Sequence, residues 1–339
     1  MKQYKLIAID LAKNVFQVCC LSKQRQLMYN KAISRQKLKA LLINTSPCTI
    51  ALEACGSAHY WVWLAEAQGH TVMLIPPQFV TPYRQGHKTD VNDALAIAHA
   101  ALAPNIRLVP PKDPARLEFQ AIHRVRSGLV GDRTRISNQI RGLLYEFGVV
   151  IPKGFSALKK NIPDILEDAE NGLSIPFRQL IHGLITDFDT ANLRIKELDQ
   201  MIVNKIKSLP MCKALLNLEG VGPIGASLLY ITLGNGSVFK NGRSASAYVG
   251  VTPKQHSSGG KVTMLGIGHS GQNKLRSVLI QGALSSVKSS LEKTDPKSRW
   301  IQGLVARGNM KKAAVALANK TVRTAWAMLS KNETYNPAT

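Results

Sequence analysis

The stretch IAIDLAKNVFQV, residues 7–18, sets the start of the fold. It joins two short apolar runs, Lys5–Asp10 and Val15–Leu21, across a polar break. Short runs rich in β-branched and aromatic residues, bounded by polar residues, predict β-strands. The first strand ends on Asp10, whose carboxylate would be strongly unfavourable if it were buried without a partner. A bound metal ion would remove that penalty, so Asp10 is the first candidate site residue.

Beyond these two strands, strand and helix signals alternate along the chain. Three strands in a meander, followed by strands alternating with helices, predict a mixed α/β sheet with helices on its faces. Pro104 ends the last helix of this series, which is rich in alanine. The further strands are expected at about 26–33, Thr49–Glu53 and Thr71–Ile75, and the helices at 36–43, 58–68 and 90–103.

The charge of the chain points to a polyanionic partner. Its 339 residues carry 44 Lys and Arg against 21 Asp and Glu, a formal net charge of +23. A soluble protein tolerates such self-repulsion when its partner is a polyanion, most often nucleic acid. The alternative is a basic protein without such a partner.

Cysteine usage and apolar runs indicate the compartment. The five cysteines show no spacing typical of a zinc knuckle, and they are interpreted as buried thiols of a reducing cytosol. The start MKQYKLIAID does not resemble a signal peptide, and no apolar run approaches the roughly 20 residues that span a bilayer. We expect a soluble cytoplasmic protein, associated with the nucleoid when active.

Charge and periodicity divide the chain into three expected domains. Residues 1–110 form the α/β domain, and only five acidic residues occur before residue 101. Residues 111–210 contain two long helical patterns, Ala115–Phe147 and about 177–209, separated by a stretch that prolines and a glycine interrupt. They predict an antiparallel helical hairpin or coiled coil, either an arm for dimerisation or RNA binding or a plain structural helix pair. Residues 211–339 are strongly basic and mainly helical.

Four of the five acidic residues of the first domain occupy strand ends or a helix start. Glu53 ends a strand like Asp10, and Asp90 and Asp93 stand three residues apart at the start of the alanine-rich helix, on one face of its first turn. Each has a plain alternative: Asp90 as a helix N-cap, Asp93 as an acidic first-turn residue, Glu53 in an ion pair. Together they predict a metal site, and carboxylate oxygens favour Mg²⁺ or Mn²⁺. Two such ions about 4 Å apart can act on the two reacting oxygens of a phosphodiester.

Two motifs stand out in the basic C-terminal part. LEGVGPIGA, residues 218–226, has the Gly-x-Gly core of a helix-hairpin-helix, whose tight turn can present backbone N–H groups to a phosphate. The alternative is a helix–helix turn without a ligand. Residues 247–276 form a Gly- and Ser-rich loop with two candidate nucleophiles, Ser257 and Ser258; His256 and His269 are near in sequence but form no triad pattern. The candidate nucleic-acid-binding residues are Gly220, Gly222, Lys254, Lys261, Lys274 and Arg276.

These strings carry a family resemblance. An Asp on the first strand, a Glu on the fourth and D-x-x-D on a late helix resemble the ribonuclease-H-like domain of RuvC-type Holliday-junction resolvases. The fuller strings IAIDLAKNVFQV, ALEACGSAHYW and KTDVNDALAIA resemble the DEDD transposases of bacterial insertion sequences. That group includes members guided by a bridge RNA and is related to a pilin-gene invertase. The resemblance covers almost the whole chain.

The resemblance implies the fold and the chemistry. It implies a RuvC-like α/β domain, a helical-hairpin or coiled-coil middle and a mainly α C-terminal domain with a helix-hairpin-helix. GVTPKQHSSGGKV resembles the family's motif in which the serine before the first Gly forms a phosphoserine link to DNA; that position is Ser258, with Ser257 as its neighbour. The implied enzyme is an RNA-guided DNA transposase that uses Mg²⁺ or Mn²⁺, cuts and joins donor and target DNA, and works as a dimer or tetramer.

Two other functions remain open at this stage. A RuvC-like resolvase would use the metal site with water as the nucleophile and would form no covalent link to DNA. A nucleic-acid-binding protein with a degenerate site would catalyse nothing, although all four carboxylates are present.

Overall fold

The computed structural model describes residues 5–268 and 271–335. It divides into two compact units, each with its own core. Of the described residues, the first contains 5–115, 232–248 and 329–333. The second contains 116–231, 249–268, 271–328 and 334–335.

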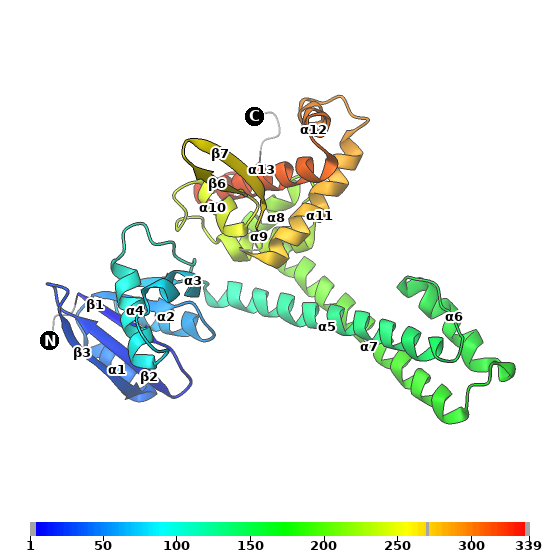
Figure 1. The fold of residues 1–339 in the computed structure, drawn as a ribbon, viewed down its shortest axis with the longest axis horizontal. Helices are drawn as coiled ribbons and strands as arrows, with labels where there is room; N and C mark the ends of the chain where they lie inside the picture. Colours follow the sequence, from blue (N-terminus) through cyan, green and yellow to red (C-terminus); the bar gives the residue numbers. More distant parts are fainter. Residues whose placement is uncertain (1–4, 269–270, 336–339) are drawn as a thin grey trace. The chain divides into compact units, whose positions relative to one another are not determined.

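The first unit is built on a five-stranded sheet in the order β3-β2-β1-β4-β5. β1, β2 and β3 pair antiparallel, whereas β4 runs parallel to β1 and to β5. This mixed sheet is the predicted one and is consistent with a ribonuclease-H-like domain (Figure 1). The strands are β1 (Leu6–Asp10), β2 (Val15–Leu21), β3 (Leu27–Ser34), β4 (Thr49–Glu53) and β5 (Thr71–Ile75), and the helices are α1 (Arg35–Asn44), α2 (Ala58–Ala67), α3 (Pro77–Val80), η1 (Thr81–Tyr83) and α4 (Asp90–Leu102).

Helices cover both faces of this sheet. Alternate residues of a strand point to opposite faces. Ile7 and Ile9 of β1 therefore lie in one core with α1 and α2, around the buried Trp61. Ala8 of β1 lies in the other core, against the alanine-rich face of α4. Asp10, two residues beyond Ala8, thus belongs to the α4 face.

The arm of the second unit is an antiparallel pair of long helices, α5 (Pro114–Tyr145) and α7 (Ile175–Lys207). Arg126 on α5 donates to Asp199 on α7 at 2.6 Å. Further along α5, Arg133 donates to Asn192, which comes earlier on α7. The helices therefore run in opposite directions, as the sequence predicts.

The stretch between these two helices corrects the expectation of an interrupted connection. It contains a helix, α6 (Phe155–Glu167), with Pro163 inside it, followed by the short turn η2 (Ala169–Asn171). An interior proline destabilises a helix by about 3 kcal/mol because it removes one hydrogen bond and its ring crowds the preceding turn. Burial of Leu158 and Ile162 in the core of the arm offsets this loss.

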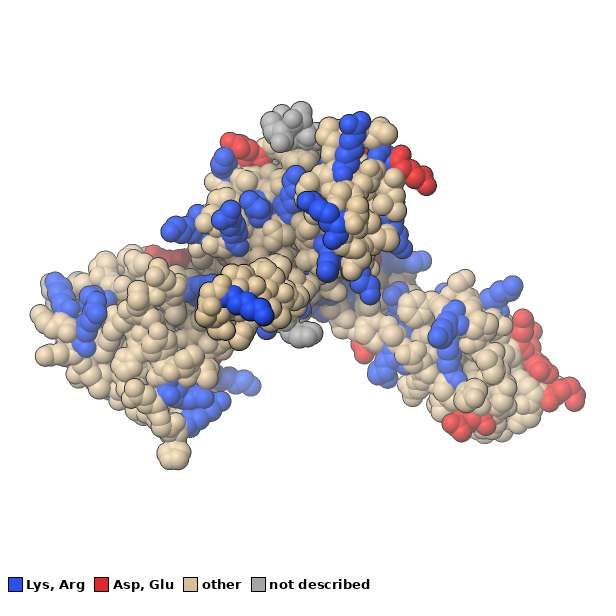
Figure 2. Space-filling view, turned by 45° about the horizontal axis from the view of Figure 1, so that its top comes forward, with Lys and Arg blue, Asp and Glu red and all other residues tan. Residues whose placement is uncertain are grey.

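The segment after the arm is mainly helical, as predicted. Its elements are α8 (Pro210–Ala214), η3 (Leu215–Asn217), α9 (Pro223–Leu233), α10 (Gly242–Val249), β6 (Pro253–Ser258), β7 (Lys261–Ile267), α11 (Asn273–Ser290), α12 (Pro296–Ala306) and α13 (Met310–Lys331). Figure 2 shows Lys and Arg spread over the part that carries α11 to α13, and acidic side chains gathered at the end of the arm near α6. The basic character found in the sequence is thus a surface property of this segment.

The Gly- and Ser-rich segment is a β-hairpin rather than the expected loop. β6 and β7 pair antiparallel, with Ser258 opposite Lys261 across the Gly259-Gly260 turn. Both turn residues have positive φ, 55° and 76°, the backbone that a two-residue hairpin turn requires and glycine adopts most easily. The glycines that suggested flexibility in the sequence therefore define a tight turn.

Gly220 and Gly282 form a close backbone crossing between the turn before α9 and the helix α11. A methyl group on Gly282 would collide with the carbonyl oxygen of Gly220. In the reverse direction, a methyl group on Gly220 would lie 2.7 Å from the carbonyl oxygen of Gly282 and 2.8 Å from Ser286 Oγ. Real Cβ atoms do not approach other atoms this closely, so both positions require glycine.

Candidate active site

The first two carboxylates lie side by side at one edge of the sheet. β1 and β4 pair in parallel register, with Ile9 beside Leu52, so Asp10 and Glu53 follow as neighbours at the carboxyl ends of these strands. Ala51 packs in the same core as α4. Since side chains alternate along a strand, Glu53 shares the α4 face with Asp10.

The first turn of α4 contributes the other two carboxylates. The N-cap of α4 is Thr89, whose hydroxyl accepts from the backbone N–H of Asn92 at 3.3 Å. Asp90 is therefore not the cap that the plain alternative supposed, and its carboxylate is not needed to begin the helix. Asp90 and Asp93 both stand in this first turn, where the helix dipole favours negative charge.

Electrostatics show that the four carboxylates act on one another. Burial and, after it, the charges of Asp93, Asp90 and Glu53 together raise the pKa of Asp10 to about 6, against a hydrogen bond from the Leu11 backbone that lowers it. Burial, with a contribution from Asp93, also raises the pKa of Glu53. Mutual repulsion of this kind stores free energy that a bound cation releases.

Two basic residues that the sequence gave no reason to single out stand at this site. Arg84 Nη1 donates to Asp93 Oδ1 at 3.1 Å, and both side chains are mostly buried. Lys88 and Arg84 both oppose the rise in the pKa of Glu53. They can be found only in the folded structure, where the turn between η1 and α4 brings them near Asp93 and Glu53. No spacing in the sequence marks them.

The donor set fits a hard divalent cation. Carboxylate oxygens are the ligands that Mg²⁺ and Mn²⁺ prefer, and the other three carboxylates all raise the pKa of Asp10. Within residues 5–268 and 271–335, no three His, Cys, Asp or Glu side chains meet closely enough to ligate an ion together. In this arrangement Asp93 is paired with Arg84 rather than grouped with the other three carboxylates.

Asp10→Asn is expected to stabilise the metal-free protein at pH 7. The folded protein keeps the Asp10 proton up to about pH 6, whereas an ordinary Asp carboxyl group in the unfolded chain has a pKa of 3.8. Between these values the unfolded chain binds fewer protons, so stability falls as pH rises, and neutral Asn escapes this loss. With solvent screening the gain is about 1–2 kcal/mol. Thermal melting in EDTA should show a higher Tm at pH 7 and a smaller gain at pH 4; an equal gain at both values would contradict it.

The hairpin places the two candidate serines on opposite faces. Directly opposed residues of an antiparallel pair share a face, and neighbours along a strand do not. Ser258 lies opposite Lys261, and His256, two residues away on the same face, lies opposite Thr263. This face is polar and exposed to solvent.

Ser257 belongs to the other face of the hairpin. It lies opposite Val262, with Gln255 and Met264 as the next pair on that face. Gln255 Nε2 donates to Ser257 Oγ at 2.8 Å. Val262 and Met264 are 64% and 59% exposed, so this face presents two apolar side chains beside Gln255 and Ser257, whereas the Ser258 face presents the cationic Lys261.

The other predicted nucleic-acid-binding residues differ in their freedom to bind. Lys254 is an exposed residue of β6, and Gly222 has open space around its Cα. Gly220 instead packs on α11. Arg276 donates to the carbonyl oxygen of Gly268 at 2.7 Å and to Asn273 Oδ1. Burial and the nearby Arg126 lower the pKa of Lys274. His269 lies outside the described residues.

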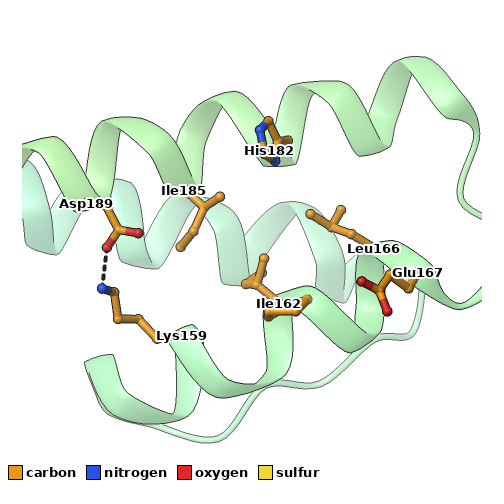
Figure 3. A pocket seen from close by; sticks show the side chains of 8 residues that line it. Lys159, Ile162, Leu166, Glu167, His182, Ile185 and Asp189 are labelled. Carbon is orange, nitrogen blue, oxygen red and sulfur yellow. Dashed lines mark ion pairs between the residues drawn. The ribbon is translucent and has the colours of Figure 1, made fainter.

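A separate groove of about 490 Å³ lies between α6 and α7. Its floor is apolar, with Ile162 and Ile185, and the ion pair of Lys159 with Asp189 at 2.6 Å closes one end (Figure 3). No predicted site residue lines it. Among the described helices, none has the length and apolar character needed to cross a bilayer.

Comparisons with known proteins place this geometry in a family. A family model described as "Transposase", for the DEDD domain of IS110 elements, matches residues 7–148, and one described as "Transposase IS116/IS110/IS902 family" matches residues 212–298. The chain is 40% identical over 332 residues to a probable family 20 transposase of Pseudomonas aeruginosa, covering 98% of each chain.

Two further relatives extend the comparison. The transposase for insertion sequence element IS1111A of Coxiella burnetii is 34% identical, with 99% of this chain and 92% of the relative covered. A pilin gene-inverting protein of Moraxella bovis is 23% identical, with 97% of each covered. The chain therefore belongs to the IS116/IS110/IS902 family of transposases and is an enzyme of DNA transposition.

Proposed function

We propose that this transposase is an RNA-guided recombinase that cuts and rejoins DNA through a 5′-phosphoserine on Ser258. The observation that carries the proposal is that Asp10 and Glu53 end neighbouring strands on the face that α4 covers, and that Glu53, Asp90 and Asp93 all act on the carboxyl group of Asp10, whose pKa is raised to about 6. These four carboxylates would hold Mg²⁺ or Mn²⁺, two ions in all. In the three-domain division predicted from the sequence, residues 1–110 would bind the metal, 111–210 would form the helical arm and 211–339 would carry the serine.

The bound ions would supply charge that polarises the scissile phosphate. The chain's own residues do the rest. Ser258 Oγ passes its proton to water and attacks phosphorus. The P–O3′ bond breaks, its electron pair stays with the 3′ oxygen, which takes up a proton from water, and the 5′ phosphate remains joined to the serine. Lys261, directly opposite Ser258 in the hairpin, is positioned to bind the phosphate.

The choice of Ser258 over Ser257 is supported by the two faces of the hairpin. Ser258 shares its face with the cationic Lys261, whereas Ser257 shares its face with the apolar Val262 and accepts a hydrogen bond from Gln255. A polyanion approaches the cationic face more favourably. Ser258 from one subunit would complete the carboxylate site of another, so the active form would be a dimer or a tetramer.

Ser258→Ala is expected to abolish covalent protein–DNA complexes, and Ser257→Ala is expected to keep them. The measurement is a denaturing gel of full-length protein on suicide DNA substrates with Mg²⁺. A Ser258→Ala band at wild-type intensity would show that the nucleophile is another residue. Cleavage by the wild-type protein without any covalent band would favour hydrolysis, as in a resolvase.

Guidance by RNA is supported by the net charge of +23 and by exposed basic residues. The guide would supply the sequence specificity, and Lys254, Lys274 and Gly222 would contact phosphate of donor and target DNA. RNA that co-purifies with the tagged protein should contain one enriched non-coding species from the element itself. Recovery of bulk cellular RNA without such a species would contradict guidance.

A further inference from the structure

Arg84 places a positive charge beside Asp93, one of the four predicted metal ligands. It follows η1, in the turn that leads to α4, and its guanidinium donates to Asp93 at 3.1 Å. The side chains of Arg84 and Asp93 are 28% and 18% exposed, so solvent screens the pair only in part. The position lies outside the predicted site residues, yet it joins one of the four carboxylates directly.

Basic side chains offset the negative charge of some carboxylates of this site more than that of others. Arg84 and Lys88 act on Glu53, and Arg84 is paired with Asp93. The leading influences on Asp10, after burial, are the charges of the other three carboxylates. Asp93 thus has a counter-ion in direct contact, whereas the strongest charges acting on Asp10 are negative.

We infer that Arg84 is an exchangeable counter-ion of the carboxylate site, and that its second partner is a DNA phosphate. Without metal it holds Asp93; when a divalent cation binds Asp93, the guanidinium is released and binds the phosphate that enters the site. This inference rests on the proposed metal-dependent function. It assigns to Arg84 a positioning role before the cation arrives and a substrate-binding role afterwards.

The chemistry of arginine suits such an exchange. Its planar guanidinium matches carboxylate and phosphate equally well and is always charged, so either partner satisfies it. The backbone around it also permits movement of the side chain. Arg84 belongs to neither η1 nor α4, and the turn that follows contains Gly86 at a φ of 76°.

A purely orienting role makes the opposite prediction for metal binding. If Arg84 only holds Asp93 in a ligating position, its removal weakens cation binding. If it competes with the cation for Asp93, its removal strengthens cation binding. The sign of the change therefore separates the two roles without reference to catalysis.

The test is Mn²⁺ titration calorimetry on the full-length Arg84→Gln protein in the absence of DNA. We expect Mn²⁺ to bind about fivefold more tightly than to wild type, because a partly buried competing charge is gone. Strand cleavage at saturating Mn²⁺ should fall by about a hundredfold, because a phosphate contact is lost. Arg84→Lys should keep wild-type Mn²⁺ affinity and restore part of the cleavage; it also serves if the Gln variant proves unstable in thermal melting.

The matched control is Arg25→Gln. Arg25 is an exposed residue of the turn between β2 and β3, and that turn lies at the opposite end of the sheet from Asp10. Its loss should change neither Mn²⁺ affinity nor cleavage. The control therefore separates the local effect of Arg84 from the general effect of removing one positive charge.

Three outcomes would overturn the inference. Weaker Mn²⁺ binding by Arg84→Gln would leave only an orienting role, and unchanged binding would show that Arg84 does not compete for Asp93. In both cases the proposed function would still stand if the wild-type protein binds Mn²⁺ and the Asp10→Asn variant does not. Wild-type protein that binds no Mn²⁺ would overturn the proposed metal site and this inference together.

Discussion

Asp10→Asn is expected to slow DNA-strand cleavage by roughly a thousandfold. The amide cannot supply the negative charge that holds a cation between β1 and α4. Loss of about 4 kcal/mol of electrostatic stabilisation at the reacting phosphate corresponds to a thousandfold in rate. The measurement is single-turnover cleavage of a donor-end substrate by full-length protein, with Mg²⁺ concentration varied to separate weak binding from slow chemistry.

Loss of folding would not explain this result, because the same variant is expected to be more stable than wild type without metal. Glu66→Gln is the matched control, since Glu66 is the one acidic residue of the first 100 that is not a predicted metal ligand, and it is exposed on α2. It removes the same charge and should cleave at the wild-type rate. Cleavage by Asp10→Asn within tenfold of wild type would contradict the assignment of Asp10 to the metal site.

Gly282→Ala is expected to destabilise the second unit by about 3 kcal/mol or more, the upper end of overpacking effects. The new methyl group would collide with the carbonyl oxygen of Gly220, and neither backbone can move alone. Ser286, one turn further along α11, confines the same turn from a second side. Urea unfolding followed by circular dichroism should show a lower midpoint, and the covalent DNA complex should be lost with the fold.

Gly303→Ala provides the control within the same unit. Gly303 lies inside α12, and a methyl group there meets no atom within 4 Å. Alanine is favoured over glycine in a helix by about 0.5–1 kcal/mol, so this variant should be slightly more stable than wild type. Equal unfolding midpoints for Gly282→Ala and wild type would show that the crossing is not rigid.

Sequence patterns predicted the sheet well because its strands depend on local signals. Runs such as Val15–Leu21 and Thr49–Glu53 begin and end where the structure has them, since polar breaks bound them on both sides. Patterns failed where packing overrode propensity. Pro163 suggested a break, yet the buried Leu158 and Ile162 hold α6 together around it.

Some residues of the candidate site could be predicted from the sequence, and others could not. Asp10 and Glu53 could be selected from sequence because a charged residue at the end of an apolar strand is conspicuous. Arg84 could not, because its importance comes from a contact with Asp93 across a turn that has no sequence signature. The distinction between Ser257 and Ser258 also needed the hairpin, since only pairing with β7 assigns each serine to a face.

The Gly259-Gly260 turn has a consequence for how this ribbon can change in evolution. Its register pairs Ser258 with Lys261, and side chains along each strand alternate with a period of two. One inserted residue between His256 and Ser258 would move the side chain of the serine to the face of Val262 and Met264. Two inserted residues would place it again on the face of Lys261. We therefore expect the strands of homologous hairpins that keep the serine on the lysine face to differ in length by even numbers of residues.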